Sequence, residues 1–286
     1  MQDLKAVRVG SARAYILNAG DMRLRLAEEM AVPESEWRPH YADTFDQPAL
    51  FPSLSIYVWD GDVKLLVDAN DYRATVAPDN PYAIPGYTPP PPIPDQLANL
   101  GVKPEDITHV VITHAHWDHF AGTTSPVSSG HEPTFPRARY YLGAADWDDA
   151  EMQTALADET SLEARTLGTL ARCGALQLVE RREPISTAIE IVPAPGETKG
   201  HQIVRVHSGD ETLYIVGDLF HHAVEVEHPE WMVVWADPET MRATRRWLLD
   251  QALAENALLI AAHIAAPGRI SREDSGLRWV NVAAGL

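Results

Sequence analysis

The densest group of reactive side chains in the sequence lies between residues 114 and 119. The segment reads His-Ala-His-Trp-Asp-His and places three imidazoles and one carboxylate within six residues. Imidazole is the commonest protein ligand for zinc-like metals, and carboxylate oxygen binds the same ions well. The segment therefore indicates a metal site that could support hydrolysis.

The backbone conformation of this segment decides how many ions it can hold. It follows residues 108–113, which read as a buried strand. If the chain stays extended, His114, His116 and Asp118 share one face, because side chains alternate along a strand. His119 then points elsewhere and can reach a second ion. The alternatives are a coincidental His-rich turn and a structural zinc site; the latter usually needs several cysteines, and the chain has only Cys173.

Four other polar residues stand next to apolar, strand-like runs. Asp68, Asp218 and His263 each follow such a run, and His201 precedes one. If these strands end at the same rim of a pair of sheets, these side chains lie together with residues 114–119. Each alone would be an ordinary turn or structural residue, so the prediction depends on their joint placement.

These motifs together resemble the metallo-β-lactamase superfamily. The family pattern is His-x-His-x-Asp-His, a His after a Pro-Gly-x-Thr-x-Gly turn, an Asp in a Gly-Asp step and a final His. The resemblance covers residues 54–270, with matches at His114, His116, Asp118, His119, His201, Asp218 and His263. It implies an α/β fold, the αβ/βα metallo-β-lactamase sandwich, in which two central mixed β-sheets carry helices on their outer faces.

The resemblance also implies two divalent metal ions per chain. One ion would be held by His114, His116 and His201, the other by Asp118, His119 and His263, with Asp218 bridging them. Asp68 would support the site structurally. Zn²⁺ is the expected metal, although iron, manganese and cobalt accept the same ligand atoms.

Such a site would carry the charge needed to activate water. Two divalent ions outweigh Asp118, Asp218 and a bridging hydroxide by about one positive charge. That charge lowers the pKa of bound water towards ~7 in known zinc enzymes. The hydroxide would attack a carbonyl or phosphoryl centre, and Asp118 is also predicted to pass a proton to the leaving alkoxide.

Departures from the family pattern indicate which branch of the superfamily the chain resembles most. Asp218 disfavours true β-lactamases, which usually carry Cys or Ser there, and His116 disfavours flavodiiron proteins, which carry Glu. The C-terminal third resembles methyl parathion hydrolases and lactonases, but His221 stands where acyl-homoserine lactonases usually carry Tyr. His221 is predicted either to donate a proton or hydrogen bond to the substrate, or to pack beside the site. Glu197 stands where the family often has His.

These features predict a dinuclear metal-dependent hydrolase that opens a lactone or cleaves an ester through a metal-bridging hydroxide. Its small-molecule substrate would carry a sizeable acyl or aromatic group, for which Trp117 and Phe220 are candidate pocket residues. Three alternatives stay open. They are a glyoxalase II-like thioester hydrolase, a phosphotriesterase, and a catalytically inert metal-bound protein that binds a ligand.

Hairpins and helices must bring these residues to one rim. Asp60-Gly61 and Ser208-Gly-Asp210 each separate two strand-like runs and are typical of hairpin turns. Helices are predicted over 94–100, 142–150, 162–173 and 238–254. Strands arriving as hairpins, with helices between the groups, favour two central sheets with helices outside.

We expect a single domain over residues 1–286. Residues 20–52 form a charged, aromatic-rich excursion that is predicted to serve as a lid or a dimer arm, or simply to pack on the surface through its own aromatics.

Composition limits the partners of the chain. Lys and Arg number 23 against 41 Asp and Glu, a formal net charge of −18. This balance disfavours nucleic acid and anionic membrane surfaces. A lone cysteine excludes an internal disulfide, and no membrane-length apolar run or secretory leader is evident, so a cytoplasmic protein is expected. A homodimer is expected only by analogy with related hydrolases.

Overall fold

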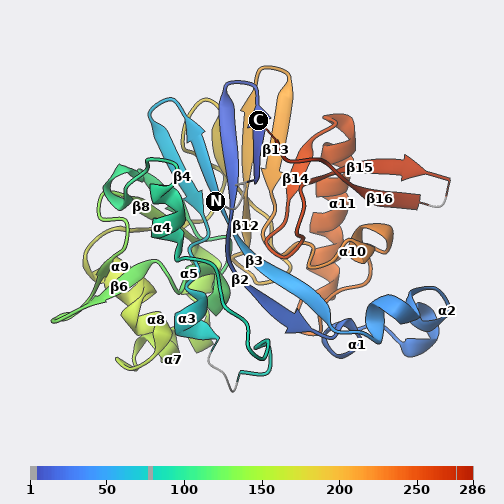
Figure 1. Ribbon diagram of the computed structural model, residues 1–286, viewed down its shortest axis with the longest axis horizontal. Coiled ribbons are helices and arrows are strands. Elements are labelled where there is room, and N and C mark those ends of the chain that lie inside the picture. The colour runs from blue at the N-terminus through green and yellow to red at the C-terminus, as the bar shows by residue number, and fades with distance from the viewer. Residues whose placement is uncertain (1–4, 77–79, 275, 286) are drawn as a thin grey trace.

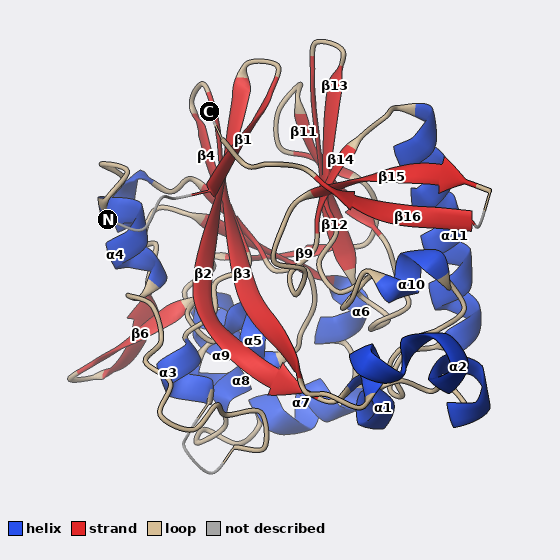
Figure 2. Cartoon of the chain, turned by 45° about the vertical axis from the view of Figure 1, so that its right-hand side comes forward, coloured by secondary structure: helices blue, strands red, loops and turns tan. Residues whose placement is uncertain are grey.

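Two seven-stranded β-sheets face each other in a computed structural model that describes residues 5–76, 80–274 and 276–285. Helices lie on the outside of the paired sheets, as both views show (Figures 1 and 2). The predicted sandwich of two mixed sheets is therefore confirmed. Residues 1–4, which belong to the N-terminal stretch for which no secretory leader is predicted, lie outside the described ranges.

The first sheet comes from the N-terminal two thirds of the chain. Its strands, in spatial order, are β1 (Lys5–Val9), β2 (Ala12–Leu24), β3 (Ala49–Asp60), β4 (Val63–Val67), β5 (His109–Val111), β8 (Arg139–Gly143) and β9 (Leu176–Val179). Pairing is antiparallel from β1 to β4 and parallel from β4 to β9. The predicted hairpin at Asp60-Gly61 is present, and Gly61 supplies its left-handed residue with φ 59°.

The second sheet follows in sequence order. Its strands are β10 (Glu183–Pro184), β11 (Ile189–Pro193), β12 (Gln202–Ser208), β13 (Glu211–Ile215), β14 (Leu258–Ile260), β15 (Gly268–Glu273) and β16 (Gly276–Asn281). Only the β13–β14 pair is parallel among these described strands. A separate hairpin joins β6 (Thr124–Val127) to β7 (Gly130–Pro133).

The helices are mostly short. They are α1 (Leu26–Glu29), α2 (Glu34–Phe45), α3 (Tyr72–Thr75), α4 (Ile93–Ala98), the 3-10 turn η1 (Pro104–Asp106), α5 (Trp117–Phe120), α6 (Ala144–Trp147), α7 (Ala150–Leu156), α8 (Leu162–Arg165), α9 (Leu167–Arg172), α10 (Val224–Glu227) and α11 (Pro238–Ala254). Within the described ranges, none of them has the length and apolar character needed to cross a lipid bilayer.

Apolar side chains fill three layers, one between the sheets and one under each set of helices. Alternate residues of both sheets, such as Val58, Leu65 and Val204, form the layer between the sheets. The intervening residues face outward, where Leu66 packs beneath α4 and α9 and Leu259 beneath α11. Both faces are buried along central strands such as β4 and β13, so the ends of these strands are left to carry polar side chains.

Two helix predictions were wrong in detail. The stretch 142–150 is divided, because β8 continues through Gly143 and α6 begins only at Ala144. The stretch 162–173 is broken at Thr166, whose φ of −102° and ψ of −87° are not helical. The predicted helix after Asp237 is confirmed, and the Asp237 carboxylate caps it by accepting from the backbone N–H of Thr240.

The excursion at 20–52 packs against the same chain. It contains the end of β2, α1, α2 and the start of β3. Trp37 stacks on Phe45, and Phe45 meets Trp231 edge-on at 5.7 Å between ring centroids. Met30 also forms a β-bridge with Val233. The excursion therefore has an intramolecular aromatic core, and its role as a lid or dimer arm stays a prediction.

Gly143 offers a test of how closely two segments near the rim approach each other. A Cβ added at Gly143 would lie 1.9 Å from the carbonyl oxygen of Gly200, whereas one at Gly285 would meet nothing within 4 Å among the described residues. We expect Gly143→Ala to lower the free energy of unfolding by about 1–3 kcal/mol, the usual cost of overpacking. Urea denaturation would measure it, with Gly285→Ala as the control. Equal stability of both variants would contradict the close approach.

Candidate metal centre

The polar residues singled out by the sequence lie at one rim of the sandwich, at the ends of its strands. Asp68 directly follows β4, and residues 114–119 follow β5. Glu197 lies in the loop after β11, Asp218 follows β13, and His263 follows β14. Side chains from segments far apart in the sequence therefore lie together at this rim.

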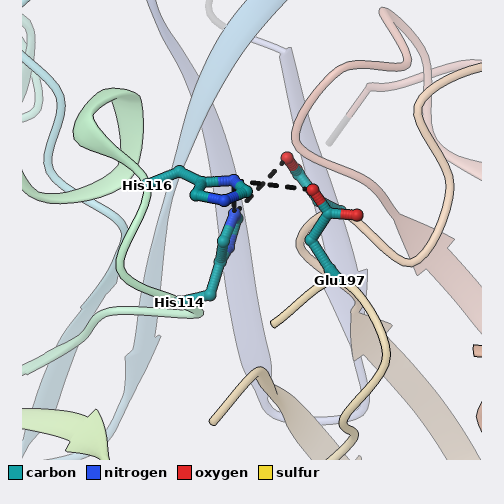
Figure 3. Close-up of side chains that lie close together, drawn as sticks. His114, His116 and Glu197 are labelled. Carbon is teal, nitrogen blue, oxygen red and sulfur yellow. Dashed lines mark hydrogen bonds and ion pairs between the residues drawn. The ribbon is translucent and has the colours of Figure 1, made fainter. Parts of the chain in front are cut away.

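The side chains form two clusters, each able to bring its ligand atoms within 4.8 Å of one another. One cluster contains His114, His116, Glu197 and Asp218, and the other contains Asp118, His119 and His263. Figure 3 shows His114 and His116 turned towards Glu197, with the Nε2 of His114 2.8 Å from the Nδ1 of His116.

Asp218 lies between the two clusters. Its Oδ2 is 3.7 Å from the Nε2 of His114, 3.3 Å from that of His119 and 3.2 Å from that of His263. This central position is the one predicted for a bridging carboxylate.

A change of backbone conformation divides the 114–119 segment. The chain is extended at His116 but enters α5 at Trp117. Asp118 therefore does not share a face with His114 and His116, as an extended segment would require. Its oxygens lie instead 3.6 Å from the Nε2 of His119 and 3.5 Å from the Nε2 of His263.

Buried hydrogen bonds hold the imidazoles of the second cluster. Asp68, in the left-handed region with φ 58°, accepts from the backbone N–H of Thr113 at 2.7 Å and contacts the Nδ1 of His119 at 2.9 Å. The Nδ1 of His263 lies 2.9 Å from the carbonyl oxygen of Pro52. Partners at Nδ1 leave each Nε2 directed at the cluster, as is typical of metal-binding histidines. Asp68 thus supports the site in the manner predicted.

A second buried aspartate, Asp146, joins the two loops of the first cluster. Its carboxylate accepts from the backbone N–H of Ala115 at 3.0 Å, the hydroxyl of Thr198 at 2.8 Å and the backbone N–H of Gly200 at 2.7 Å. No motif in the sequence marked this residue. It ties the His114–His116 segment to the Glu197 loop.

Glu197, and not His201, stands with His114 and His116. The Nδ1 of His201 lies 2.9 Å from the carbonyl oxygen of Ala194, and its Nε2 accepts from the backbone N–H of Asp218 at 3.2 Å. Both ring nitrogens are therefore engaged with the backbone, which corrects the predicted ligand set. The signal for Glu197 was present in the sequence, since it stood where the family often has His.

His221 also lies inside the centre. Its Nε2 is 3.3 Å from the Oδ2 of Asp218 and 3.6 Å from the Oε1 of Glu197. Burial alone would lower the pKa of His221, but the Glu197 and Asp218 carboxylates outweigh it and raise that pKa well above its usual value.

A buried ion pair holds the loop that carries His221. The carboxylate of Glu225 accepts from the backbone N–H groups of His221 and His222, and its other oxygen pairs with Arg245. Arg245, on α11, also donates to the carbonyl oxygens of Leu219 and Pro229. Both side chains are fully buried, so the loop is fixed by charge-assisted hydrogen bonds.

The donor set of the centre fits divalent metal ions. The Nε2 of His119, the Oε2 of Glu197 and the Oδ1 of Asp218 are buried without a hydrogen-bond partner among the described residues. Burial, followed by the neighbouring imidazoles of His119 and His116, holds the pKa of His114 well below its usual value, so its ring is neutral and can ligate. Buried polar atoms normally have partners, and cations between the two clusters would supply them.

An aromatic cavity of about 90 Å³ opens onto both clusters. Its walls include Met22, Phe51, Tyr82, Trp117 and Trp235. The prediction for Trp117 as a lining residue is confirmed. The prediction for Phe220 was wrong, because that ring is fully buried beneath Arg245 in the core.

The Glu225–Arg245 pair predicts how stability depends on pH. Burial would raise the pKa of Glu225, but Arg245 and His221 outweigh it and lower that pKa from 4.5 to about 2. A carboxyl whose folded pKa is depressed stabilises the fold above its unfolded pKa and loses that contribution as pH falls through the folded value. The loss should therefore occur between pH 4.5 and about 2.

We expect Glu225→Gln to cost about 3–5 kcal/mol of unfolding free energy at pH 7, because it leaves Arg245 buried without its partner. The deficit relative to the unsubstituted protein should shrink as pH falls towards 2. Denaturant unfolding across this range would measure it, and Glu230→Gln, at an exposed residue, should change little. A difference in unfolding free energy that stays constant from pH 7 to 3 would contradict a depressed pKa of Glu225 in the ion pair.

Comparisons with known proteins agree with this geometry. A model of the metallo-beta-lactamase superfamily matches residues 49–125, the stretch that contains Asp68 and the His114–His119 segment. Probable metallo-hydrolases of Mycobacterium bovis and Mycobacterium tuberculosis are each 29% identical over 142 residues, 44% of this chain. The match spans 41% of each relative, so the chain covers well under half of their length.

Solved structures share the whole fold. AidC, a dizinc quorum-quenching lactonase in complex with the product N-hexanoyl-L-homoserine, superposes with a TM-score of 0.78 at 20% identity and covers 99% of this chain and 98% of its own. A probable metal-dependent hydrolase from Staphylococcus aureus gives a TM-score of 0.76 at 19% identity, with 98% and 100% coverage. At these identities the likeness is one of fold. The chain is thus similar to the metallo-β-lactamase superfamily over residues 49–125 of its sequence, and it shares the sandwich fold of these solved structures.

Proposed function

We propose that the chain is a dinuclear metal-dependent hydrolase that opens a lactone or cleaves a carboxylic ester. The observation that carries this proposal is the pair of buried clusters on either side of Asp218, at the wall of an aromatic cavity. The dizinc lactonase of the same fold supports it as an analogy.

Seven side chains would hold the two ions. They are His114, His116 and Glu197 on one side, Asp118, His119 and His263 on the other, and Asp218 between them. Two divalent ions in such a site supply Lewis acidity, which lowers the pKa of a water molecule and polarises a carbonyl oxygen. Zn²⁺ is the metal that the resemblance implies, and Mn²⁺ and Fe²⁺ accept the same nitrogen and oxygen ligands.

The aromatic cavity would bind the acyl part of the substrate. Met22, Leu24 and Phe51 come from β2 and β3, and Trp117 and Trp235 line the same space from other segments. Such side chains bury an apolar chain and exclude water from the reacting carbonyl. The curved ends of β2 and β3 thus link the excursion at 20–52 to substrate recognition.

Asp118 and His221 would move the protons. Asp118 lies beside both imidazoles of the second cluster, where it would take a proton from the attacking water and return it to the leaving alkoxide. The ring of His221, on the opposite side of Asp218, would donate a hydrogen bond to the carbonyl or leaving oxygen.

Charge around the site favours neutral substrates. A larger cavity of about 940 Å³ shares His116, Glu197 and Trp235 with the centre, and its other walls include Asp149, Glu151, Glu163 and Asp237. Among the described residues, Lys199 is the one lysine or arginine that lines it, and this lysine is paired with Asp149. An anionic thioester such as that of glutathione would meet repulsion there, which disfavours the glyoxalase II-like alternative.

Turnover by metal-quantified protein tests the proposed function. The panel would contain acyl-homoserine lactones, γ- and δ-lactones, aryl esters, methyl parathion and S-lactoylglutathione. We expect a lactone or ester with kcat/KM above about 10⁴ M⁻¹s⁻¹, little turnover of the thioester, and loss of activity in His116→Ala. His131→Ala, on the outlying β6–β7 hairpin, is the matched control and should keep full activity. Two bound ions without any turnover would favour a ligand-binding protein.

The role of His221 is separable from that of the ligands. We expect His221→Gln to keep two ions per chain but to lower kcat by about 10²–10⁴, the usual contribution of a positioned acid or base. Metal analysis and steady-state kinetics on the same preparation would measure both quantities. An unchanged kcat would show that His221 only packs beside the centre.

A further inference from the structure

The donors on the two sides of Asp218 are equal in kind. The first side offers the imidazoles of His114 and His116 with the carboxylate of Glu197. The second offers two imidazoles with the carboxylate of Asp118. Each side therefore presents two nitrogens and one terminal carboxylate, and both share the central aspartate. A histidine at position 197 would instead have given the first side three imidazoles.

The surroundings of Glu197 suit a metal ligand. Its side chain is fully buried. One oxygen accepts from the indole N–H of Trp235, and this oxygen also lies 3.5 Å from the Nδ1 of His116. The other oxygen, Oε2, has no hydrogen-bond partner in the part of the chain that the structure describes. Ion pairs to Glu197 are made only by histidines over the same residues. A buried carboxylate needs compensation by a cation.

A purely supporting role for Glu197 explains less. As an acceptor for Trp235 and a neighbour of His221 it would use only Oε1, and Oε2 would stay buried and unmatched. Coordination of an ion accounts for both oxygens. It is also consistent with the position of His201, whose two ring nitrogens both contact backbone groups.

We propose that Glu197 is a ligand of the first metal ion and that its carboxylate shifts this site towards harder divalent ions, Mn²⁺ or Fe²⁺, and away from Zn²⁺. Mn²⁺ is better matched by a carboxylate oxygen than by an imidazole nitrogen. A ligand set of two histidines and one carboxylate is characteristic of Fe²⁺. This inference rests on the proposed dinuclear site and adds which ion that site prefers.

The additional carboxylate also changes the charge of the loaded centre. Asp118, Glu197 and Asp218 bring three negative charges, so two divalent ions leave a net charge of about +1 before any hydroxide binds. With a histidine at 197 the corresponding charge would be about +2. A less positive centre holds a second cation more readily, because the repulsion between the ions is offset by one more carboxylate.

Binding of Mn²⁺ to the metal-free protein, followed by electron paramagnetic resonance and competed with Zn²⁺, tests the proposal without any substrate. We expect two Mn²⁺ per chain in the unsubstituted protein. Glu197→Gln should lose one of them or bind it at least tenfold more weakly. Glu197→His should bind two Zn²⁺ but raise the Zn²⁺ to Mn²⁺ affinity ratio of one site at least tenfold.

Glu163→Gln is the matched control, since Glu163 lines the neighbouring larger cavity and belongs to neither cluster. Occupancy of the second site by the unchanged Asp118, His119 and His263 reports that each variant is folded. Unchanged Mn²⁺ binding in Glu197→Gln, or an unchanged ratio in Glu197→His, would overturn the proposal. Failure of the proposed function would look different, with both sites loading as expected and no lactone or ester being hydrolysed.

Discussion

Three carboxylates buried side by side are the constraint on which the rest of this structure depends. Asp118, Glu197 and Asp218 belong to the two clusters at the rim of the sandwich, which also contain four imidazoles and adjoin His221. Burying so much charge is costly unless cations balance it. The imidazoles already depress the pKa of Asp218 against the effect of burial. Metal ions would complete the compensation, so folding, metal binding and chemistry share one set of residues.

The fold provides the rigidity that this arrangement needs. Strand ends from both sheets meet at the rim, and each ligand-bearing loop is tied by a buried group. Asp68 holds Thr113 and His119, Asp146 joins Ala115 to Gly200, and Arg245 with Glu225 fixes the loop that carries His221. Ligands held in this way lose little freedom on binding, which is what lets a site favour one geometry and one class of ion.

The sequence predicted the sandwich and most of the centre, because both rest on local signals. Hairpin turns such as Asp60-Gly61 and the 114–119 motif are visible in a few residues. What it missed depends on contacts between distant segments. The helical turn at Trp117 moves Asp118 to the second cluster, and the backbone partners of His201 leave its place to Glu197. Asp146 and the Arg245–Glu225 pair carry no motif, since their partners are spread from 3 to 54 residues away along the chain.

Crystals of the metal-loaded protein, with diffraction recorded on both sides of the metal absorption edge, would show which side chains hold the two ions. We expect two anomalous peaks per chain, both next to Asp218. One should be bounded by His114, His116 and Glu197, the other by Asp118, His119 and His263. A single peak, or a first ion bound through His201 with Glu197 turned away, would contradict this expectation.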